Sequence, residues 1–264
     1  MAHARIRALS ALVGAVLLAG CGGSDKPVSS SPTTAGVPTT AAAAPRTNTQ
    51  LAADQALAQQ AVLRLADVPA GYKSTPTRNT PADDVPAAVA AHFSACTHVA
   101  LPVVTTLLNQ RTRPGMVLAA SPNFVKSESE LAGTDIASAA EVHVSSKQLS
   151  QELDQLGAAG ALGCWKAFLK AAVNPGGSGT TLHALDVASV SLGSLGDQRA
   201  AVGATVTVAN GAQTVNEYFD FCIVRRGRAD AVLLLIVEGG SVDRALERSL
   251  LAKMVGRLQT AAGS

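Results

Sequence analysis

The segment Ala8–Cys21, which reads ALSALVGAVLLAGC, constrains this chain most, because it decides in which compartment the rest must fold. The basic residues Arg5 and Arg7 precede an apolar run of about a dozen residues that ends in a cysteine. This order is typical of a bacterial lipoprotein signal. We therefore predict that residues 1–20 are a signal peptide and that Cys21 is acylated. The lipid would anchor the mature chain at the outer face of the cytoplasmic membrane.

Two other interpretations of this segment are weaker. A permanent transmembrane helix needs about 20 apolar residues, which is longer than this run. The signal of a soluble secreted protein ends in a small residue and does not require Cys21. The lipoprotein interpretation alone uses the charge, the apolar length and the cysteine together, so we expect the membrane to be a partner through the anchor.

The charge balance of the mature chain excludes one class of partner. The whole sequence has 21 basic and 19 acidic residues, and removal of residues 1–20 would remove Arg5 and Arg7, which makes the two numbers equal. A neutral chain has no electrostatic reason to bind nucleic acid. Aromatic residues make up only 3% of the sequence, which argues against a carbohydrate-binding surface of exposed rings.

The sequence divides into three regions. After the signal, residues 21–50 are rich in Ser, Thr, Pro and Ala and contain almost no large apolar side chains. Such a segment cannot offset its ordering entropy by burial, so we predict a lipidated, disordered linker. Residues 51–264 are apolar enough to bury a core, and we expect them to form one exported domain.

Periodicity predicts that this domain belongs to the α+β class, with an antiparallel β-sheet flanked by helices. Apolar residues alternate with Glu141, His143 and Ser145, which predicts a half-buried strand over Ile136–Ser145. We expect it to pair with a strand in Met116–Leu131 through a turn at Gly133–Asp135. Leu233–Val237 is apolar without alternation, so we expect a central strand covered on both faces. Helices are predicted near Leu51–Leu65 and over Ala87–Cys96, Leu101–Gln110, Leu149–Leu156, Ala161–Val173 and Val242–Leu258, with further strands over Asp186–Leu192, Ala200–Ala209, Gln213–Arg225 and Ala229–Glu238.

Three further capping and loop features accompany these elements. Ser145–Gln148 has the pattern of a capping box. Asn174–Gly179 is predicted to be a loop, and Gly239–Ser241 is predicted to cap the last helix. The apolar positions of that helix recur every four residues, which predicts a stripe that faces the sheet.

Three cysteines remain once Cys21 is acylated, and an oxidising compartment favours a disulfide among them. We expect Cys96 and Cys164, on two predicted helices, to pair, although three pairings exist and spacing does not select one. Closing that loop would stabilise the fold by about 4 kcal/mol in the chain-entropy model. Cys222 would then be a small buried residue within a strand.

No residues are assigned to catalysis, a cofactor or a metal. His92, Cys96 and His98 are the closest group of metal-ligand types, but His98 leaves the helix face shared by the other two and no fourth ligand is evident. Gly177–Gly179 and Gly193–Gly196 do not complete the nucleophile-elbow pattern or a phosphate-binding loop. We therefore predict that the chain is not an enzyme and needs no cofactor.

The dense basic cluster Arg225, Arg226 and Arg228 lies between two predicted strands. The favoured interpretation is a solvated hairpin turn. The alternative is contact with an anionic surface, such as lipid head groups or cell-wall phosphates.

With these features, the chain resembles a family of actinobacterial cell-envelope lipoproteins. Their exported domain is similar to the extracellular sensor domain of the mycobacterial PknH-type serine/threonine kinases and, more distantly, to the PsbP/Mog1-like fold. The resemblance covers about Leu51–Ala261 and implies an antiparallel sheet with flanking helices and a role in binding. It depends on Asp67–Tyr72, Phe93–Cys96, the helix with Cys164, and Asp220–Arg228 with the strand and helix that follow. Such kinase sensors have two disulfides, whereas this chain retains three cysteines after Cys21.

The sequence thus predicts a lipid-anchored, sensor-like module that binds a lipid, glycan or protein of the cell envelope without catalysis. A lipid or glycolipid carrier with an apolar cavity is the alternative, and an envelope hydrolase is the third hypothesis. A deep apolar cavity would favour the carrier, and a shallow cleft would favour the binding module. Polar groups that converge around a nucleophile would favour the hydrolase.

Overall fold

The computed structural model describes residues 46–76, 85–109, 112, 115–129, 132–144, 147–173, 180–210 and 213–262. The predictions for the signal peptide, Cys21, most of the linker, the capping box at Ser145 and the loop at 174–179 lie outside these residues. Within the described ranges, no helix is long and apolar enough to cross a membrane.

The described chain is an α+β structure, as predicted. Its helices are α2 (Asn48–Ala61), α3 (Ala87–Thr97), α4 (Leu101–Asn109), α5 (Lys147–Gly157), α6 (Ala161–Val173) and α7 (Arg244–Ala262), with a short 3-10 turn η1 (Leu65–Asp67). Its strands are β1 (Lys73–Thr75), β2 (Met116–Ala120), β3 (Asn123–Ser127), β4 (Gly133–His143), β5 (Thr180–Ser189), β6 (Gln198–Asn210), β7 (Gln213–Arg226) and β8 (Ala229–Glu238).

The strands form one antiparallel sheet in the order β1-β3-β4-β8-β7-β6-β5, and β2 also pairs with β4. β3 pairs with the first part of β4 and β2 with its last part, so the two short strands share one edge of a long strand. The pairing of β4 with β8 joins segments about 90 residues apart and brings the two halves of the sequence together. This long-range pairing positions both of the clusters described below.

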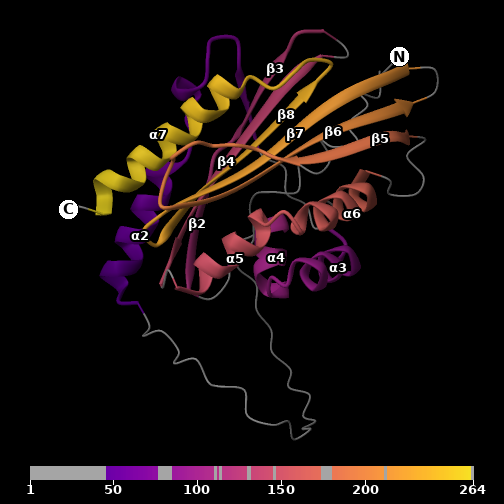
Figure 1. Cartoon of the computed structure of the whole chain (residues 1–264). Helices are drawn as coiled ribbons and strands as arrows, with labels where there is room; N and C mark the ends of the chain where they lie inside the picture. The colour runs from indigo at the N-terminus through magenta and orange to yellow at the C-terminus, as the bar shows by residue number, and fades with distance from the viewer. Residues whose placement is uncertain are drawn as a thin grey trace, which may run out of the picture.

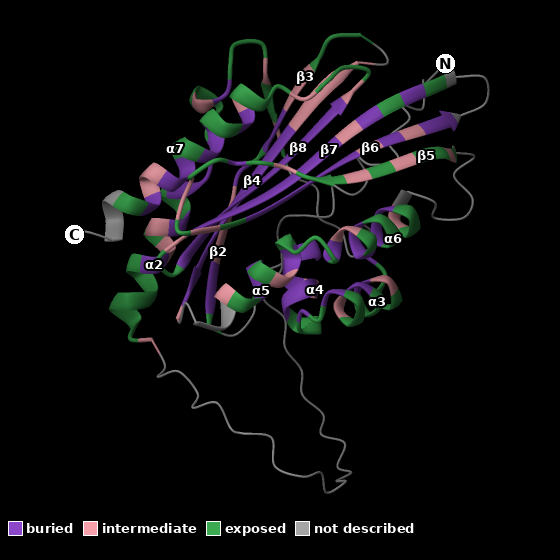
Figure 2. Cartoon of the chain, viewed as in Figure 1, coloured by how far each residue is buried: buried purple, intermediate pink, exposed green. Residues whose placement is uncertain are grey.

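Helices cover both faces of the sheet, which gives three layers (Figure 1). α2 and α7 lie on one face, and α3, α4, α5 and α6 lie on the other. The side chains of β8 alternate between the two cores, with Leu234 and Ile236 on the α3–α6 side and Leu233 and Leu235 on the α7 side. Figure 2 shows this central strand buried along its length, whereas β5 at the sheet edge is largely exposed.

Most elements lie where periodicity places them. The observed β8 has the predicted bounds, and its burial on both faces confirms the prediction of a central strand. α7 presents Leu250, Met254 and Leu258 to the sheet, as its four-residue spacing predicted. The first helix begins at Asn48, three residues before the expected domain start, because Thr47 and Gln50 form a capping box.

Three local predictions are wrong. Gly133–Asp135 is not a turn, because these residues are the first of β4 and pair with β3 and β8. The predicted long strand at Met116–Leu131 is two strands, separated at Ser121 and Pro122. Gly239–Ser241 does not cap α7 either. The side chain of Asp243 accepts hydrogen bonds from the backbone N–H groups of Ala245 and Leu246 instead.

Candidate functional site

The predicted disulfide is present. Cys96 on α3 and Cys164 on α6 are bonded, with their Cα atoms 5.7 Å apart. Beside the disulfide, the rings of Phe93 and Trp165 meet edge to face with centroids 4.7 Å apart. The bond therefore fixes the helical layer that covers one face of the sheet. Cys222 is the free cysteine of the described chain and is fully buried, as predicted.

The disulfide also excludes the group His92, Cys96 and His98 as a metal site, because the Cys96 sulfur is bonded to another cysteine. His92 and His98 are both exposed at the surface of α3 and at its end. His98 has a positive φ of 58° and ends the helix.

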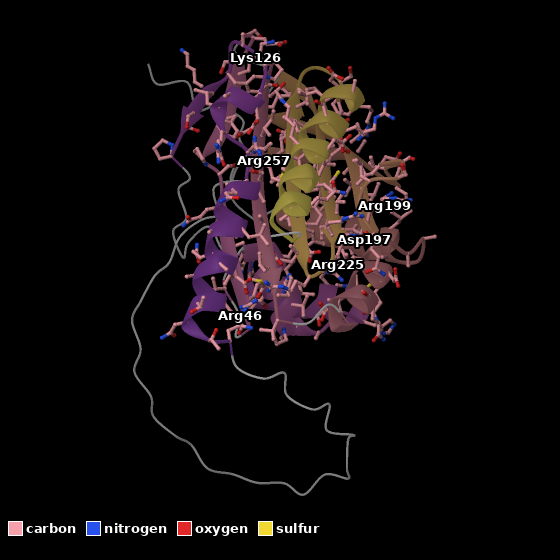
Figure 3. All side chains as sticks on the ribbon, turned by 90° about the vertical axis from the view of Figure 1, so that its left-hand side faces the viewer. Arg46, Lys126, Asp197, Arg199, Arg225 and Arg257 are labelled. Atoms are coloured by element: carbon pink, nitrogen blue, oxygen red, sulfur yellow. A yellow bond between two sulfur atoms is a disulfide. The ribbon has the colours of Figure 1, made fainter. Side chains whose placement is uncertain are left out.

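The three clustered arginines separate in the structure. Arg225 is only 2% exposed and pairs with Asp230, so both the solvated-turn interpretation and the prediction of an anionic-surface contact are wrong for this residue. Its side chain lies toward the end of the sheet opposite Lys126 (Figure 3). Arg226 pairs with Asp197, and Arg228 pairs with Asp54 on α2.

Arg225 belongs to a buried group that we call the histidine cluster: Glu141, His143, Arg225 and Asp230. The sheet register builds it, because Asp230 on β8 lies directly opposite both Glu141 on β4 and Arg225 on β7. His143 follows Glu141 by two residues and therefore projects from the same face of β4. All four side chains point toward the layer of α4 and α5.

The geometry of the histidine cluster is tight. Arg225 donates two hydrogen bonds to the Asp230 carboxylate, each 2.8 Å long. The Nε2 atom of His143 lies 3.3 Å from the Glu141 carboxylate and 3.2 Å from that of Asp230. Each member of the cluster is at most 7% exposed, so water screens none of these charges effectively.

Two pKa shifts reflect this arrangement. Burial by itself raises the pKa of Asp230, but the contacts with His143 and Arg225 outweigh it and leave the pKa below its ordinary value. Burial lowers the pKa of His143, yet the Asp230 and Glu141 carboxylates raise it overall. Each charge is therefore stabilised by its neighbours.

A small cavity of about 30 Å³ adjoins this cluster between the sheet and the helices α4 and α5. Glu141, Arg225, Asp230 and the α5 residue Glu152 line it, together with apolar side chains such as Leu107. Its volume has room for a water molecule or two, or for an ion.

A second buried group lies on the opposite face, and we call it the thiol cluster: Asp220, Cys222, Arg244 and Glu247. Asp220 and Cys222 lie on the face of β7 that packs against α7, whereas Arg244 and Glu247 come from the first turn of α7. The Cys222 thiol donates to one Glu247 oxygen at 2.8 Å. Arg244 donates to the other Glu247 oxygen at 2.8 Å and to Asp220.

The carboxylates of the thiol cluster are crowded rather than individually paired. Burial, together with the Glu247 charge, raises the pKa of Asp220 to about 6 despite its contact with Arg244. Burial also raises the pKa of the Cys222 thiol well above its usual value, so the thiol remains protonated and donates to Glu247. A buried protonated thiol is a poor nucleophile.

A groove of about 110 Å³ leads from solvent to this cluster. The register forms its floor, with Asp186, Thr205 and Tyr218 in one row across β5, β6 and β7. In the next row Gly203 lies opposite Asp220, and a Cβ atom at Gly203 would lie 2.6 Å from the Asp220 carboxylate. The missing side chain therefore leaves the space that Asp220 occupies. α7 packs on β7 and β8, so Arg244 stands at the groove edge.

Sequence reasoning did not identify either cluster. It placed Glu141 and His143 on the solvent face of a half-buried strand, whereas both faces of β4 are covered. Their spacing of two residues on one strand was the signal available in the sequence. Asp230, which completes the group, is about 90 residues away, and only the pairing of β4 with β8 brings it there.

Comparison of this chain with protein-family models, curated proteins and solved structures finds no match.

Proposed function

We propose that this chain is a lipid-anchored, extracytoplasmic binding module of the cell envelope that does not catalyse a reaction. Its ligand would enter the groove beside α7. The observation that supports this proposal most is the combination of an open groove with a buried carboxyl group, Asp220, whose pKa is strongly displaced. Displaced pKa values in a cleft are a recognised indication of a functional site.

The charges of the groove favour a cationic group on the ligand. Asp186 and Asp220 line the groove, and Arg244 is the single basic residue among the described lining residues. Arg244 is already shared between Asp220 and Glu247. Asp186 is exposed and has no ion pair with another described residue. An ammonium group would find a free carboxylate at the mouth and the hydroxyl groups of Thr205 and Tyr218 beside it.

The size of the groove limits what it accepts. About 110 Å³ holds a terminal group of a larger molecule rather than a whole organic ligand, which needs roughly 300 Å³ or more. We therefore propose an amine-bearing component of the cell wall, of which one end enters the groove. Neither of the two cavities described above is a large apolar one, so they lend no support to the carrier hypothesis.

Neither a cysteine nor a histidine is among the described residues that line the groove, which supports a binding role over hydrolysis. The thiol nearest to it, Cys222, is fully buried and held protonated beside two carboxylates. The basic residue at the edge, Arg244, cannot act as a general base.

Isothermal titration calorimetry on the full chain, purified from its native membrane in detergent, tests the ligand. The probe is a soluble cell-wall peptide fragment with a free primary amine, and the same fragment with its amine acetylated is the control. We expect binding of the first fragment only, weakened by roughly tenfold in Asp186→Asn, since a charge-assisted hydrogen bond contributes about 1.5 kcal/mol.

Asp154→Asn is the matched control variant. It removes the same charge from an exposed position on α5, which lies on the other face of the sheet. Equal binding of both fragments, or equal losses in the two variants, would overturn the proposed site.

The membrane anchor is tested separately. Intact mass spectrometry should find a diacyl or triacyl modification on Cys21 and a chain that begins there, and Cys21→Ala should release the protein from the membrane fraction. An unmodified N-terminus would contradict the anchored location. Lipid that co-purifies beyond the covalent chains would favour the carrier.

A further inference from the structure

The histidine cluster contains three metal-ligand types that converge on one point. Glu141, His143 and Asp230 each offer one ligand atom, and these atoms all lie within 4.8 Å of one another. β4 and β8 hold all three residues, and both strands are buried in the centre of the sheet. A site built on paired central strands is held more rigidly than one on loops.

The distances within this group match a metal coordination shell. Zinc binds imidazole nitrogen and carboxylate oxygen at about 2.0–2.2 Å, so neighbouring ligand atoms of a tetrahedral site lie about 3.3–3.5 Å apart. The Nε2 atom of His143 is 3.3 Å from Glu141 and 3.2 Å from Asp230. The first separation lies at the short end of the expected edge length, and the second is 0.1 Å shorter.

The Nε2 atom of His143 makes no well-directed hydrogen bond to a described residue. Although its Nε2 atom is close to both carboxylates, neither contact has the directed geometry of a hydrogen bond, and the atom is buried without a hydrogen-bond partner. A buried imidazole nitrogen that lies within 3.3 Å of two carboxylates and makes no directed hydrogen bond is available to a metal ion.

The surroundings of these three residues are mainly acidic and include a small cavity. Among the described residues that line the adjoining cavity, Glu141, Asp230 and Glu152 are acidic and Arg225 is the one cation. A divalent ion bound by an imidazole that has lost its proton would place positive charge beside the Glu141 and Asp230 carboxylates, of which Asp230 already pairs with Arg225. The cavity of about 30 Å³ has room for the water that completes a four-coordinate shell.

Arg225 is compatible with this arrangement. It binds Asp230 through two parallel hydrogen bonds of 2.8 Å and so fixes the orientation of that carboxylate. Carboxylates that bind metals are commonly oriented by a hydrogen-bonded neighbour in this way. The remaining Nη1 of Arg225 is buried and has no hydrogen-bond partner, so it is available to a water or another acceptor in the cavity.

We propose that Glu141, His143 and Asp230 bind a divalent transition-metal ion, for which zinc is the best match in charge and ligand type. Arg225 is a positioning residue for Asp230. The site lies on the opposite face of the sheet from the groove beside α7, so its occupancy and the proposed ligand are independent. Because the ion would join β4 to β8, it stabilises the folded state by mass action.

The test uses the full chain, purified in detergent with a tag that contains no histidine and then treated with a chelator. Zinc chloride is the probe, followed by elemental analysis, calorimetry and thermal unfolding. We expect one zinc ion per chain and a melting temperature that rises with zinc concentration. A chain that is folded by circular dichroism but takes up no stoichiometric zinc overturns the proposal.

His143→Gln and His92→Gln form a matched pair of variants. The first removes the proposed ligand, and we expect zinc affinity to fall by at least about tenfold, in line with losses seen when groups around metal sites are changed. The second removes an exposed histidine on α3 and should leave zinc binding unchanged. Equal affinities in the two variants would place the metal elsewhere.

X-ray absorption at the zinc edge on the unaltered chain keeps the test decisive if His143→Gln does not fold. We expect a first shell of oxygen and nitrogen atoms with the signature of one imidazole. A sulfur atom in that shell would place the ion at Cys222 and overturn the assignment.

Discussion

The histidine cluster and the thiol cluster bury charge on opposite faces of the same sheet, but they stabilise it in different ways. In the histidine cluster, Arg225 is itself buried and holds Asp230 through two hydrogen bonds. In the thiol cluster, Arg244 has a side chain that is 46% exposed and is shared between two buried carboxylates. The first cluster pairs its charges, whereas the second leaves one carboxyl group prone to protonation.

The difference follows from what covers each cluster. A helical layer fixed by a disulfide covers the histidine cluster, so its cation has no contact with bulk water. The thiol cluster lies at the first turn of α7, where the groove reaches solvent. Two clusters of similar composition therefore have opposite pKa shifts at their aspartates, downward for Asp230 and upward for Asp220.

The largest expected effect is that of Arg225→Met, measured by urea unfolding with metal chelated. The variant leaves the Asp230 carboxylate buried without its cation, so we expect the free energy of unfolding to fall by about 3–5 kcal/mol. Arg244→Met is the counterpart in the thiol cluster. It should cost only about 1 kcal/mol, because water reaches that guanidinium. Equal losses of unfolding free energy in the two variants would show that burial does not make Arg225 more important than Arg244.

Removal of the disulfide tests whether the layer over the histidine cluster is a separate unit. The double variant Cys96→Ala and Cys164→Ala should lose about 3 kcal/mol, since measured losses commonly fall below the chain-entropy value for a long loop. Hydrogen exchange should increase in α3 and α6 while α7 stays protected. An equal increase in α7 would mean that both faces open together.

The thiol cluster should produce a pH dependence through Asp220, which faces Arg244 and Glu247 on α7 and Cys222 on its own strand. Its pKa is about 6 in the folded state, above the ordinary value of 3.8. The folded state therefore binds this proton more tightly than the unfolded state does. As the pH rises from about 4 to 6, the contribution of Asp220 to the free energy of unfolding falls. The total loss is about 2–3 kcal/mol.

Asp220→Asn should remove that part of the pH profile in thermal unfolding measured between pH 4 and 7. Asp154→Asn, an exposed position, should leave the profile unchanged. A profile that keeps its shape in Asp220→Asn would contradict the raised pKa.

The smallest expected effect concerns Cys222. Cys222→Val removes the donor to Glu247 at similar volume, and we expect a loss of about 1 kcal/mol. Cys222→Ser keeps a donor and should cost less, as measured by urea unfolding. A larger loss in the serine variant would show that Cys222 acts only as an apolar core residue.

Local patterns predicted much of this fold. The apolar run of β8 specified a strand covered on both faces, and the four-residue spacing of α7 specified its buried stripe. The hairpin before β4 was placed wrongly, because glycine at position 133 indicated a turn but the residue pairs with Ser127 in the sheet. A Cβ there would lie 2.9 Å from the Lys126 carbonyl oxygen, so the glycine serves close strand approach.

The sequence by itself determined the class of the domain and the elements that compose it, because these depend on periodicity and on residue chemistry over short distances. The tertiary structure alone decided which polar side chains meet. Glu141 and His143 seemed suited to solvent by alternation, and burial of both faces of β4 reversed that interpretation. Asp230 reaches them through strand pairing, and Arg244 reaches Asp220 through helix packing. Such contacts depend on register between distant segments, which no local spacing encodes.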